Sequence, residues 1–272
     1  MSTPSRQALP IVALVLGAAS LAAQSDPDHW LAQCRRHDWK ERPKVCLVRE
    51  TGMRPSGGAL TVDPGQNGGV ALFGWDRDSI AVVAKIQASA RTDDAAQRLA
   101  DGIRIEASGR TIRASGPGRG TREHWSVSFD VYVPRHTDLA LATENGPLSV
   151  EDVSGTMDLR AQNGPVSLAG VSGNVTARVQ NGPLSVRLSG TRWEGTGLDA
   201  EAVNGPVDLA IPERYNARLE TGTVNGPMNV AFPLTVTVQG HVTQRIQTTL
   251  GEGGAPVRVV TTNGPLTIRR AR

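Results

Sequence analysis

The sequence predicts an all-β protein: a parallel β-solenoid with coils of about 18 to 23 residues, a small N-terminal capping sheet and one short helix. Two patterns carry this prediction. The triplet Asn-Gly-Pro recurs through the second half of the chain, and each copy is followed by alternating apolar and small polar residues. A recurring unit of this size is typical of chains that stack equivalent coils. The composition agrees, since 30 glycines and only 4% aromatic residues favour repetitive β structure over a helical enzyme.

The triplet is predicted to be the corner of each coil. Its copies begin at spacings of 18, 18, 23, 21 and 38 residues, at Asn145, Asn163, Asn181, Asn204, Asn225 and Asn263. Asparagine tolerates left-handed dihedrals, glycine permits positive φ, and proline can begin a strand although it cannot donate to a ladder. Asparagines stacked at one corner could also satisfy one another's amide groups.

Each triplet precedes a strand with period-two alternation, as in Leu148-Ser149-Val150. A second strand fits in each period, for example over residues 157–159, so neighbouring coils would stack about 4.8 Å apart and bury one apolar column. The outward positions form a column of small polar residues, which is a candidate partner-binding stripe: Ser149, Ser167, Ser185, Asp208, Asn229 and Thr267. Plain solvation of a strand face is the alternative reading.

We expect four regions: a signal peptide over residues 1–23, a basic segment over 24–58, a strand-rich capping region over 59–138, and the repeats over 139–272. Residues 66–70 look like a degenerate corner, so the repeat could begin before residue 139. The single helix is expected between Thr92 and Gly102, because acids occupy its first turn and a glycine follows it.

The N-terminus indicates export. Arg6 is the only charge before Asp26, residues 8–19 are mostly apolar, and the small residues that follow offer a cleavage site. The mature protein is therefore expected to be soluble in the periplasm or outside the cell, although an uncleaved anchor is an alternative. In such an oxidising compartment Cys34 and Cys46 are expected to form a disulfide, with two reduced thiols as the alternative.

The formal net charge of +3 predicts no broad basic field and thus no nucleic-acid partner. Basic residues do crowd the N-terminal segment, at Arg35, Arg36, Lys40, Arg42, Lys44, Arg49 and Arg54. They could touch anionic envelope polymers or lipid head groups. A solvated charged loop is the simpler explanation, because such blocks of charge are common on protein surfaces.

The search for catalytic chemistry finds little. The five histidines lack zinc-site spacing, and no nucleophile elbow, phosphate loop or dinucleotide fingerprint is present, so no metal, cofactor or catalytic residue is predicted. A polysaccharide-cleaving β-helix remains the enzymatic alternative, with paired carboxylates drawn from Asp152, Asp158, Asp199, Glu201 and Asp208. Sugar-stacking or partial core burial would explain the tryptophans, Trp30, Trp39, Trp75, Trp125 and Trp193.

Several motifs together resemble a known family. They are Cys46-Leu47-Val48-Arg49-Glu50, Gly74-Trp75-Asp76-Arg77, Tyr132-Val133-Pro134-Arg135 and the stretch from Leu219 to Gly226. From about residue 34 to its end the chain resembles a bacterial family of domains of unknown function whose members are called adhesins, with β-strand repeats. Its relatives commonly carry Asn-Gly-Gly at the corner. The resemblance implies an exported protein of β-helical type linked to the cell envelope, without catalytic residues.

The sequence thus predicts an exported, non-catalytic repeat protein that acts in cell-envelope or surface interaction. Its partner would be a glycan, a lipid head group or a protein. An envelope scaffold or stress-sensing module and a polysaccharide-active enzyme are the alternatives. A monomer is expected, with self-association as the alternative, because Arg269, Arg270 and Arg272 follow the last strand and would protect an open sheet edge.

Overall fold

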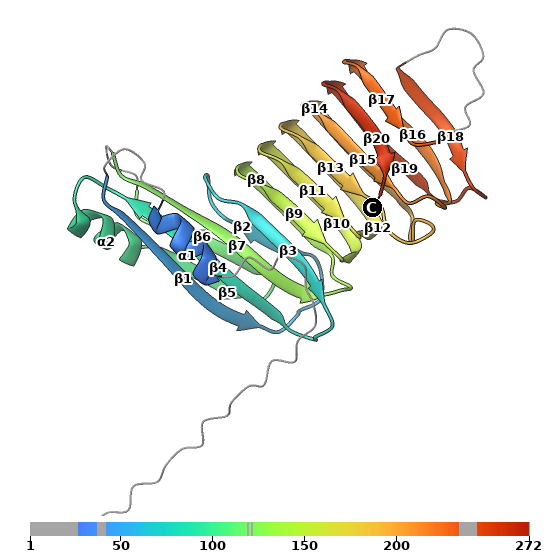
Figure 1. The fold of residues 1–272 in the computed structure, drawn as a ribbon. Coiled ribbons are helices and arrows are strands. Elements are labelled where there is room, and N and C mark those ends of the chain that lie inside the picture. Colours follow the sequence, from blue (N-terminus) through green and yellow to red (C-terminus); the bar gives the residue numbers. More distant parts are fainter. Residues whose placement is uncertain (1–26, 37–41, 119, 121, 234–243, 272) are drawn as a thin grey trace, which may run out of the picture.

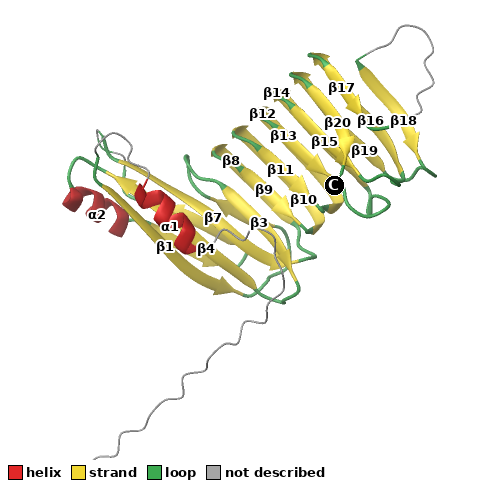
Figure 2. Ribbon diagram, in the orientation of Figure 1, coloured by secondary structure: helices red, strands yellow, loops and turns green. Residues whose placement is uncertain are grey.

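The computed structural model describes residues 27–36, 42–118, 120, 122–233 and 244–271. The predicted signal peptide over residues 1–23 lies outside the described residues. Within them, the chain forms two short helices and twenty strands, and the strands make two ten-stranded sheets that face each other (Figures 1 and 2). The predicted all-β class is therefore confirmed.

We call the two sheets A and B. The strands of sheet A, in spatial order, are β1 (Lys44–Met53), β4 (Ile80–Ser89), β7 (His124–Pro134), β3 (Val70–Trp75), β9 (Leu148–Glu151), β11 (Val166–Ala169), β13 (Leu184–Arg187), β15 (Val207–Ile211), β20 (Leu266–Arg270) and β17 (Met228–Ala231). Those of sheet B are β18 (Arg245–Leu250), β16 (Ala217–Asn225), β19 (Pro256–Asn263), β14 (Gly197–Asn204), β12 (Ser172–Asn181), β10 (Ser154–Asn163), β8 (Leu139–Asn145), β2 (Leu60–Asp63), β6 (Thr111–Ser115) and β5 (Arg104–Ser108).

The central strands stack in parallel with equivalent residues in register. Leu159 of β10, for example, pairs with Leu141 of β8 on one side and with Ala177 of β12 on the other. The apolar residue of each alternation points between the sheets and is buried along nearly the whole stack. Each fully buried Leu or Val contributes roughly 1.5–3 kcal/mol, so the repeat only becomes stable when several units stack.

The sheets are mixed, which corrects the expectation of a uniformly parallel solenoid with a separate capping sheet. The N-terminal strands β1, β4 and β7 pair antiparallel with one another, as do β5 with β6 and β16 with β18. They belong to the same two sheets as the repeats, because β7 pairs with β3 and β6 pairs with β2. These pairings satisfy the outer edges of β2 and β3, which a terminal coil would otherwise leave open.

The last repeat is inserted out of sequence order. Strand β19 lies between β14 and β16, and β20 lies between β15 and β17. The expectation that Arg269 and Arg270 protect a terminal edge is therefore wrong, because β20 has a parallel neighbour on both sides. Arg269 instead binds the carboxylate of Asp208 on β15, with a shortest N–O distance of 2.7 Å.

The helix expected between Thr92 and Gly102 is confirmed as α2 (Asp93–Asp101), and the Thr92 hydroxyl accepts a hydrogen bond from the Ala95 amide at its start. A second helix, α1 (Pro27–Arg36), was not predicted, so the expectation of one helix is wrong. Its only buried residue is Cys34, which gives the sequence too little apolar periodicity to reveal it. The Cys34–Cys46 disulfide, which the structure contains, fastens α1 to β1.

Candidate functional site

The Asn-Gly-Pro triplets form one corner along the whole stack. Each asparagine Nδ2 donates to the Oδ1 of its neighbour at 2.8–3.0 Å, and the ladder runs in the order Asn145, Asn163, Asn181, Asn204, Asn263 and Asn225. Asn145 in turn donates to the Oδ1 of Asn67 at 3.2 Å, in the degenerate corner before residue 139. The asparagines therefore hold neighbouring coils together. The ladder also follows the inserted position of the last repeat, because Asn263 lies between Asn204 and Asn225.

Glycine is required at the corner mainly because backbones approach closely there. Of the six corner glycines only Gly182 has a positive φ, of 153°. A Cβ at Gly164 would collide with the Gly146 carbonyl oxygen, and one at Gly205 with that of Gly182. The expected explanation through positive φ is thus wrong for most corners. The prolines that follow are exposed. The Pro165 carbonyl, for example, accepts a hydrogen bond at 2.9 Å from the amide of Leu148, the first residue of β9 in the neighbouring coil.

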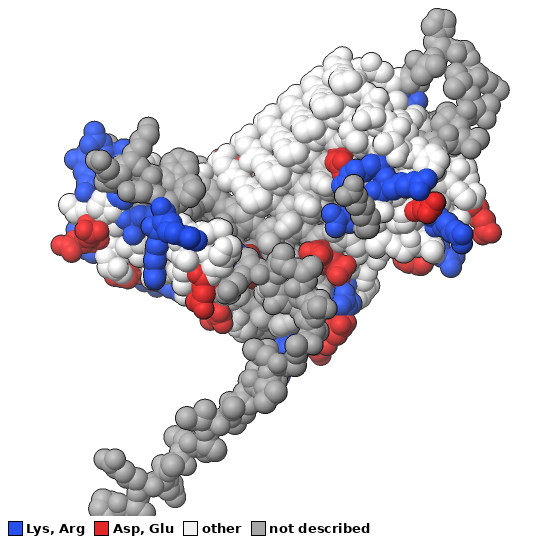
Figure 3. All heavy atoms as spheres, viewed as in Figure 1, with Lys and Arg blue, Asp and Glu red and all other residues white. Residues whose placement is uncertain are grey.

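The predicted polar stripe lies on the outer face of sheet A. Its members occupy equivalent register positions of neighbouring strands, in the order Ser149, Ser167, Ser185, Asp208, Thr267 and Asn229. We call this set the serine row. Ser167 and Asn229 are exposed, and the others are half-buried. Asp208 is the one charged member of the row and is bound by Arg269, and the three serines form its longest uncharged run. Figure 3 shows a broad uncharged area over the stacked repeats, with charged side chains gathered on the N-terminal part and along the lower side of the stack in this view.

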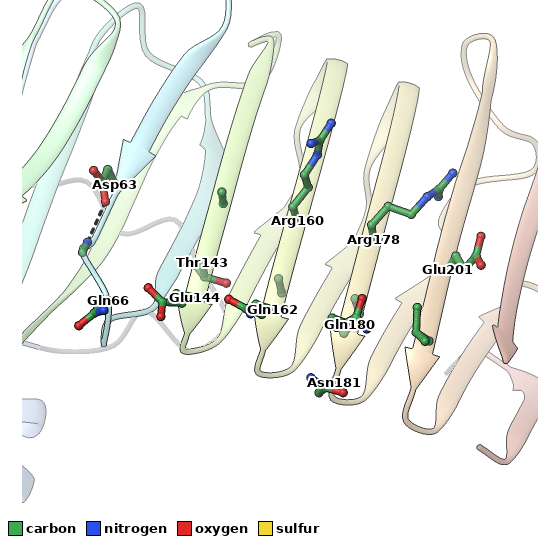
Figure 4. Close-up of a pocket in the computed structure, with 15 residues that line it drawn as sticks. Asp63, Gln66, Thr143, Glu144, Arg160, Gln162, Arg178, Gln180, Asn181 and Glu201 are labelled. Atoms are coloured by element: carbon green, nitrogen blue, oxygen red, sulfur yellow. Dashed lines mark hydrogen bonds between the residues drawn. The ribbon is translucent and has the colours of Figure 1, made fainter. Parts of the chain in front are cut away.

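A groove of about 990 Å³ crosses the outer face of sheet B (Figure 4). Its centre carries the same two residue types from consecutive repeats, namely Arg160 and Gln162 on β10, and Arg178 and Gln180 on β12. Sequence reasoning did not single out these residues. The signal was available, because Arg-x-Gln-Asn-Gly-Pro occurs twice, at 160–165 and at 178–183.

Beyond this groove, sheet B carries a network of ion pairs around Arg258 of β19. Its Nη1 lies 2.7 Å from Asp199 Oδ1 and 3.3 Å from Glu201 Oε2, both on β14. Its Nε lies 3.2 Å from Glu220 Oε1 on β16. Arg258 thus links the inserted strand to both of its neighbours.

The network shifts the titration of its carboxylates. Burial alone would raise the pKa of Asp199, but hydrogen bonds from Arg178 and Arg258 hold that pKa below its usual value. The hydrogen bond from Arg245 lowers the pKa of Glu220, and Arg258 adds to this effect. Both groups are therefore stabilised as carboxylates.

The five carboxylates considered for catalysis are each paired with an arginine. Asp152 faces Arg135, Asp158 binds Arg160, Asp208 binds Arg269, and Asp199 and Glu201 share Arg258. They lie on both sheets and at a turn, so the structure does not bring the whole set together. For Asp199, the lowered pKa is also the wrong direction for a general acid. Among the described residues, no three His, Cys, Asp or Glu side chains are grouped as metal ligands would be.

The tryptophans serve several structural roles. Trp193 is buried and its Nε1 donates to the Gly173 carbonyl at 3.0 Å, while the half-buried Trp125 donates to Pro117. Trp75 lies 5.5 Å from the Tyr132 ring, with Arg77 above it. Trp30 on α1 is half-buried, and Trp39 lies outside the described residues.

The basic N-terminal segment does not present all its charges to solvent. The Arg49 guanidinium is part-buried and donates to the Ile103 carbonyl. Arg36 donates to the Ala32 carbonyl within α1, and Lys40 lies outside the described residues. Where the chain is described, no helix is long and apolar enough to span a membrane.

The fold and its outer rows define a β-repeat protein that exposes regular polar surfaces on two stacked sheets. A protein-family model, Toastrack DUF4097, matches residues 103–269, and the chain belongs to this family. The expected family resemblance is thereby confirmed.

The solved structures that match this chain share little of its sequence. A "putative cell adhesion protein" from Clostridium sporogenes is 11% identical, with a TM-score of 0.35 over 84% of this chain and 100% of that one. A "putative adhesin" from Bacteroides fragilis is 11% identical, with a TM-score of 0.37 over 84% and 97%. A "Putative lipid binding protein" from Parabacteroides distasonis is 9% identical, with a TM-score of 0.27 over 84% and 97%. No curated protein matches the chain.

Proposed function

We propose that this protein is an exported, non-catalytic module that binds a component of the cell envelope or cell surface through the outer faces of its stacked repeats. The observation that carries the proposal is the register of these faces. Equivalent outward side chains of successive repeats stand side by side over six parallel strands in each sheet. A partner with a repeating structure would meet the same groups at each strand, about 4.8 Å apart.

We infer that the parallel part of the chain works as a short β-solenoid. Its interior is filled by apolar columns, and its corner is fixed by the asparagine ladder. The outer side chains are then free to vary without loss of the fold, which suits a recognition surface. The serine row on sheet A is the first candidate surface, because its three serines form a flat, uncharged strip.

The polysaccharide-active alternative is less well supported. The candidate carboxylates are neutralised by arginines, and Asp199 keeps a low pKa. Glycosidases instead need one carboxyl group with a raised pKa opposite a second carboxylate.

A binding screen tests the proposal. The chain from Gln24 onward is titrated against peptidoglycan, lipopolysaccharide, anionic lipid vesicles and a glycan panel. We expect saturable binding to one of these components and no release of reducing sugar ends. Binding should be lost when Ser149, Ser167 and Ser185 are all changed to Arg, which we call the serine-row variant. The absence of binding to every surface would contradict the proposal and favour a scaffold with a protein partner, while release of reducing ends would favour the enzyme.

A further inference from the structure

We infer that the groove on the outer face of sheet B is a second binding site, and that its ligand is a neutral glycan chain. The inference goes beyond the proposed function, because it assigns a ligand class to a surface other than the serine row. The groove volume of about 990 Å³ lies within the usual size of a small-molecule site. Figure 4 shows its polar side chains standing on successive strands of the stack.

The groove contains two rows of side chains that run across the strands. Arg160 of β10 pairs in register with Ala142 of β8 and with Arg178 of β12, and Arg178 pairs with Glu201 of β14. The second row, two residues further along each strand, consists of Glu144, Gln162, Gln180 and Val203. Neighbouring positions in a row are about 4.8 Å apart, which is close to the advance of one sugar unit in an extended chain. A linear glycan lying along the stack would thus meet one strand per sugar.

The polar groups of the groove match sugar hydroxyls, which both donate and accept hydrogen bonds. The guanidinium groups only donate, the carboxylates accept, and the amides of Gln162 and Gln180 do both. Within the described part of the chain, neither of these two glutamines uses its side chain in a hydrogen bond, and both are exposed. Their amides are therefore available to a ligand at no cost in existing contacts.

The arginines are already held in place. Arg160 binds Asp158 through Nε at 3.0 Å and Nη2 at 2.8 Å. Arg178 binds the Asp199 side chain and donates from Nη1 to the Asp199 carbonyl at 2.9 Å. Fixed orientation lowers the entropy cost of binding.

Charge argues against an anionic polymer. The groove lining includes the carboxylates of Asp63, which is paired with Arg113, and of Glu144 and Glu201. Its two arginines are themselves paired with Asp158 and Asp199, so neither is an uncompensated positive charge. Glu201 is also paired with Arg258, so Glu144 on β8, beside the glutamine row, is the carboxylate that would repel a ligand with a regular negative charge. An uncharged chain with many hydroxyl groups is the ligand that this surface complements.

The test uses isothermal titration calorimetry with three hexasaccharides: the neutral hexamers of N-acetylglucosamine and of glucose, both β-1,4-linked, and anionic hexagalacturonate. We expect saturable binding of at least one neutral hexamer and none of the anionic one. The double variant Gln162→Ala/Gln180→Ala should bind the neutral hexamer about tenfold more weakly, because two hydrogen bonds are lost. The matched control Gln97→Ala, in α2, should bind like the parent chain.

Either of two results with the neutral hexamers would overturn the inference: no saturable binding of either hexamer, or equal binding by the double variant and the parent. The serine-row variant separates this failure from that of the proposed function. If that variant loses binding to an envelope component while no hexamer binds the parent, the proposed function stands and the groove assignment fails. Binding of hexagalacturonate in the groove would replace the neutral ligand with an anionic one and also overturn the inference.

Discussion

The inserted position of the last repeat predicts an unusual order of mutational effects. Val259 on β19 is fully buried between β14 and β16, whereas Val230 on β17 is 39% exposed. Changing either valine to alanine removes the same two methyl groups. In the buried case the lost transfer free energy is about 1.6 kcal/mol, at about 0.8 kcal/mol for each group. The cavity that remains adds to this cost, which gives a total of about 2.5 kcal/mol for Val259→Ala. The half-exposed Val230→Ala should cost less than about 1 kcal/mol.

Urea denaturation followed by circular dichroism measures both values, provided that the slope of the transition is unchanged. The comparison is sharp because strictly sequential stacking predicts the reverse. In that arrangement β17 would be an interior strand and the strands of the last repeat would be terminal. A larger loss of unfolding free energy for Val230→Ala than for Val259→Ala would refute the insertion.

Two further predictions concern the corner and the ion-pair network. Asn181→Ala breaks two hydrogen bonds of the ladder, whereas Asn225→Ala, at its end, breaks one. The first variant should therefore lower the unfolding free energy by about 1–2 kcal/mol and the second by about half as much. Equal losses of unfolding free energy in urea titrations would argue against a cooperative ladder. Folding lowers the pKa values of Asp199 and Glu220. The stability that these carboxylates contribute is therefore complete above their unfolded pKa values, about 3.9 and 4.3, and it is lost as the pH falls through their folded pKa values. Thermal unfolding between pH 7 and pH 3 should therefore show a smaller acid loss in Arg258→Gln than in the parent chain, and parallel losses would contradict this assignment.

The repeat was readable from sequence because its signals are local. Asn-Gly-Pro followed by period-two alternation specifies a corner and a strand within a few residues, and the capping threonine and acidic first turn specify α2 in the same way. The inward columns and the serine row followed directly from this alternation.

The order of the strands could not be predicted from the sequence, because it depends on which strand edges pair with one another once the last repeat folds back onto the stack. The six triplets are nearly identical, so nothing local distinguishes the coil that ends at Asn225 from the one that ends at Asn263. The deciding contacts are long-range, such as Arg258 with Glu220 and Arg269 with Asp208. For the same reason, the joining of the N-terminal strands to both sheets could not be predicted.

The groove was missed for another reason. Its residues are polar and outward, which alternation alone explains as solvation. The repeated Arg-x-Gln before the corner could have indicated the two rows, and the register shows that Arg160 and Gln162 lie beside Arg178 and Gln180.

The most direct test of the central claim compares the serine-row variant with a charge-matched control in binding to the envelope component that the screen identifies. The control carries three arginines at exposed positions away from the row, in place of Gln97, Ser108 and Thr111. Both variants should unfold at the same urea concentration as the parent chain. We predict that the serine-row variant loses binding while the control keeps it. Unchanged binding by the serine-row variant, or equal loss in both, would contradict recognition through the serine row of the stacked repeats.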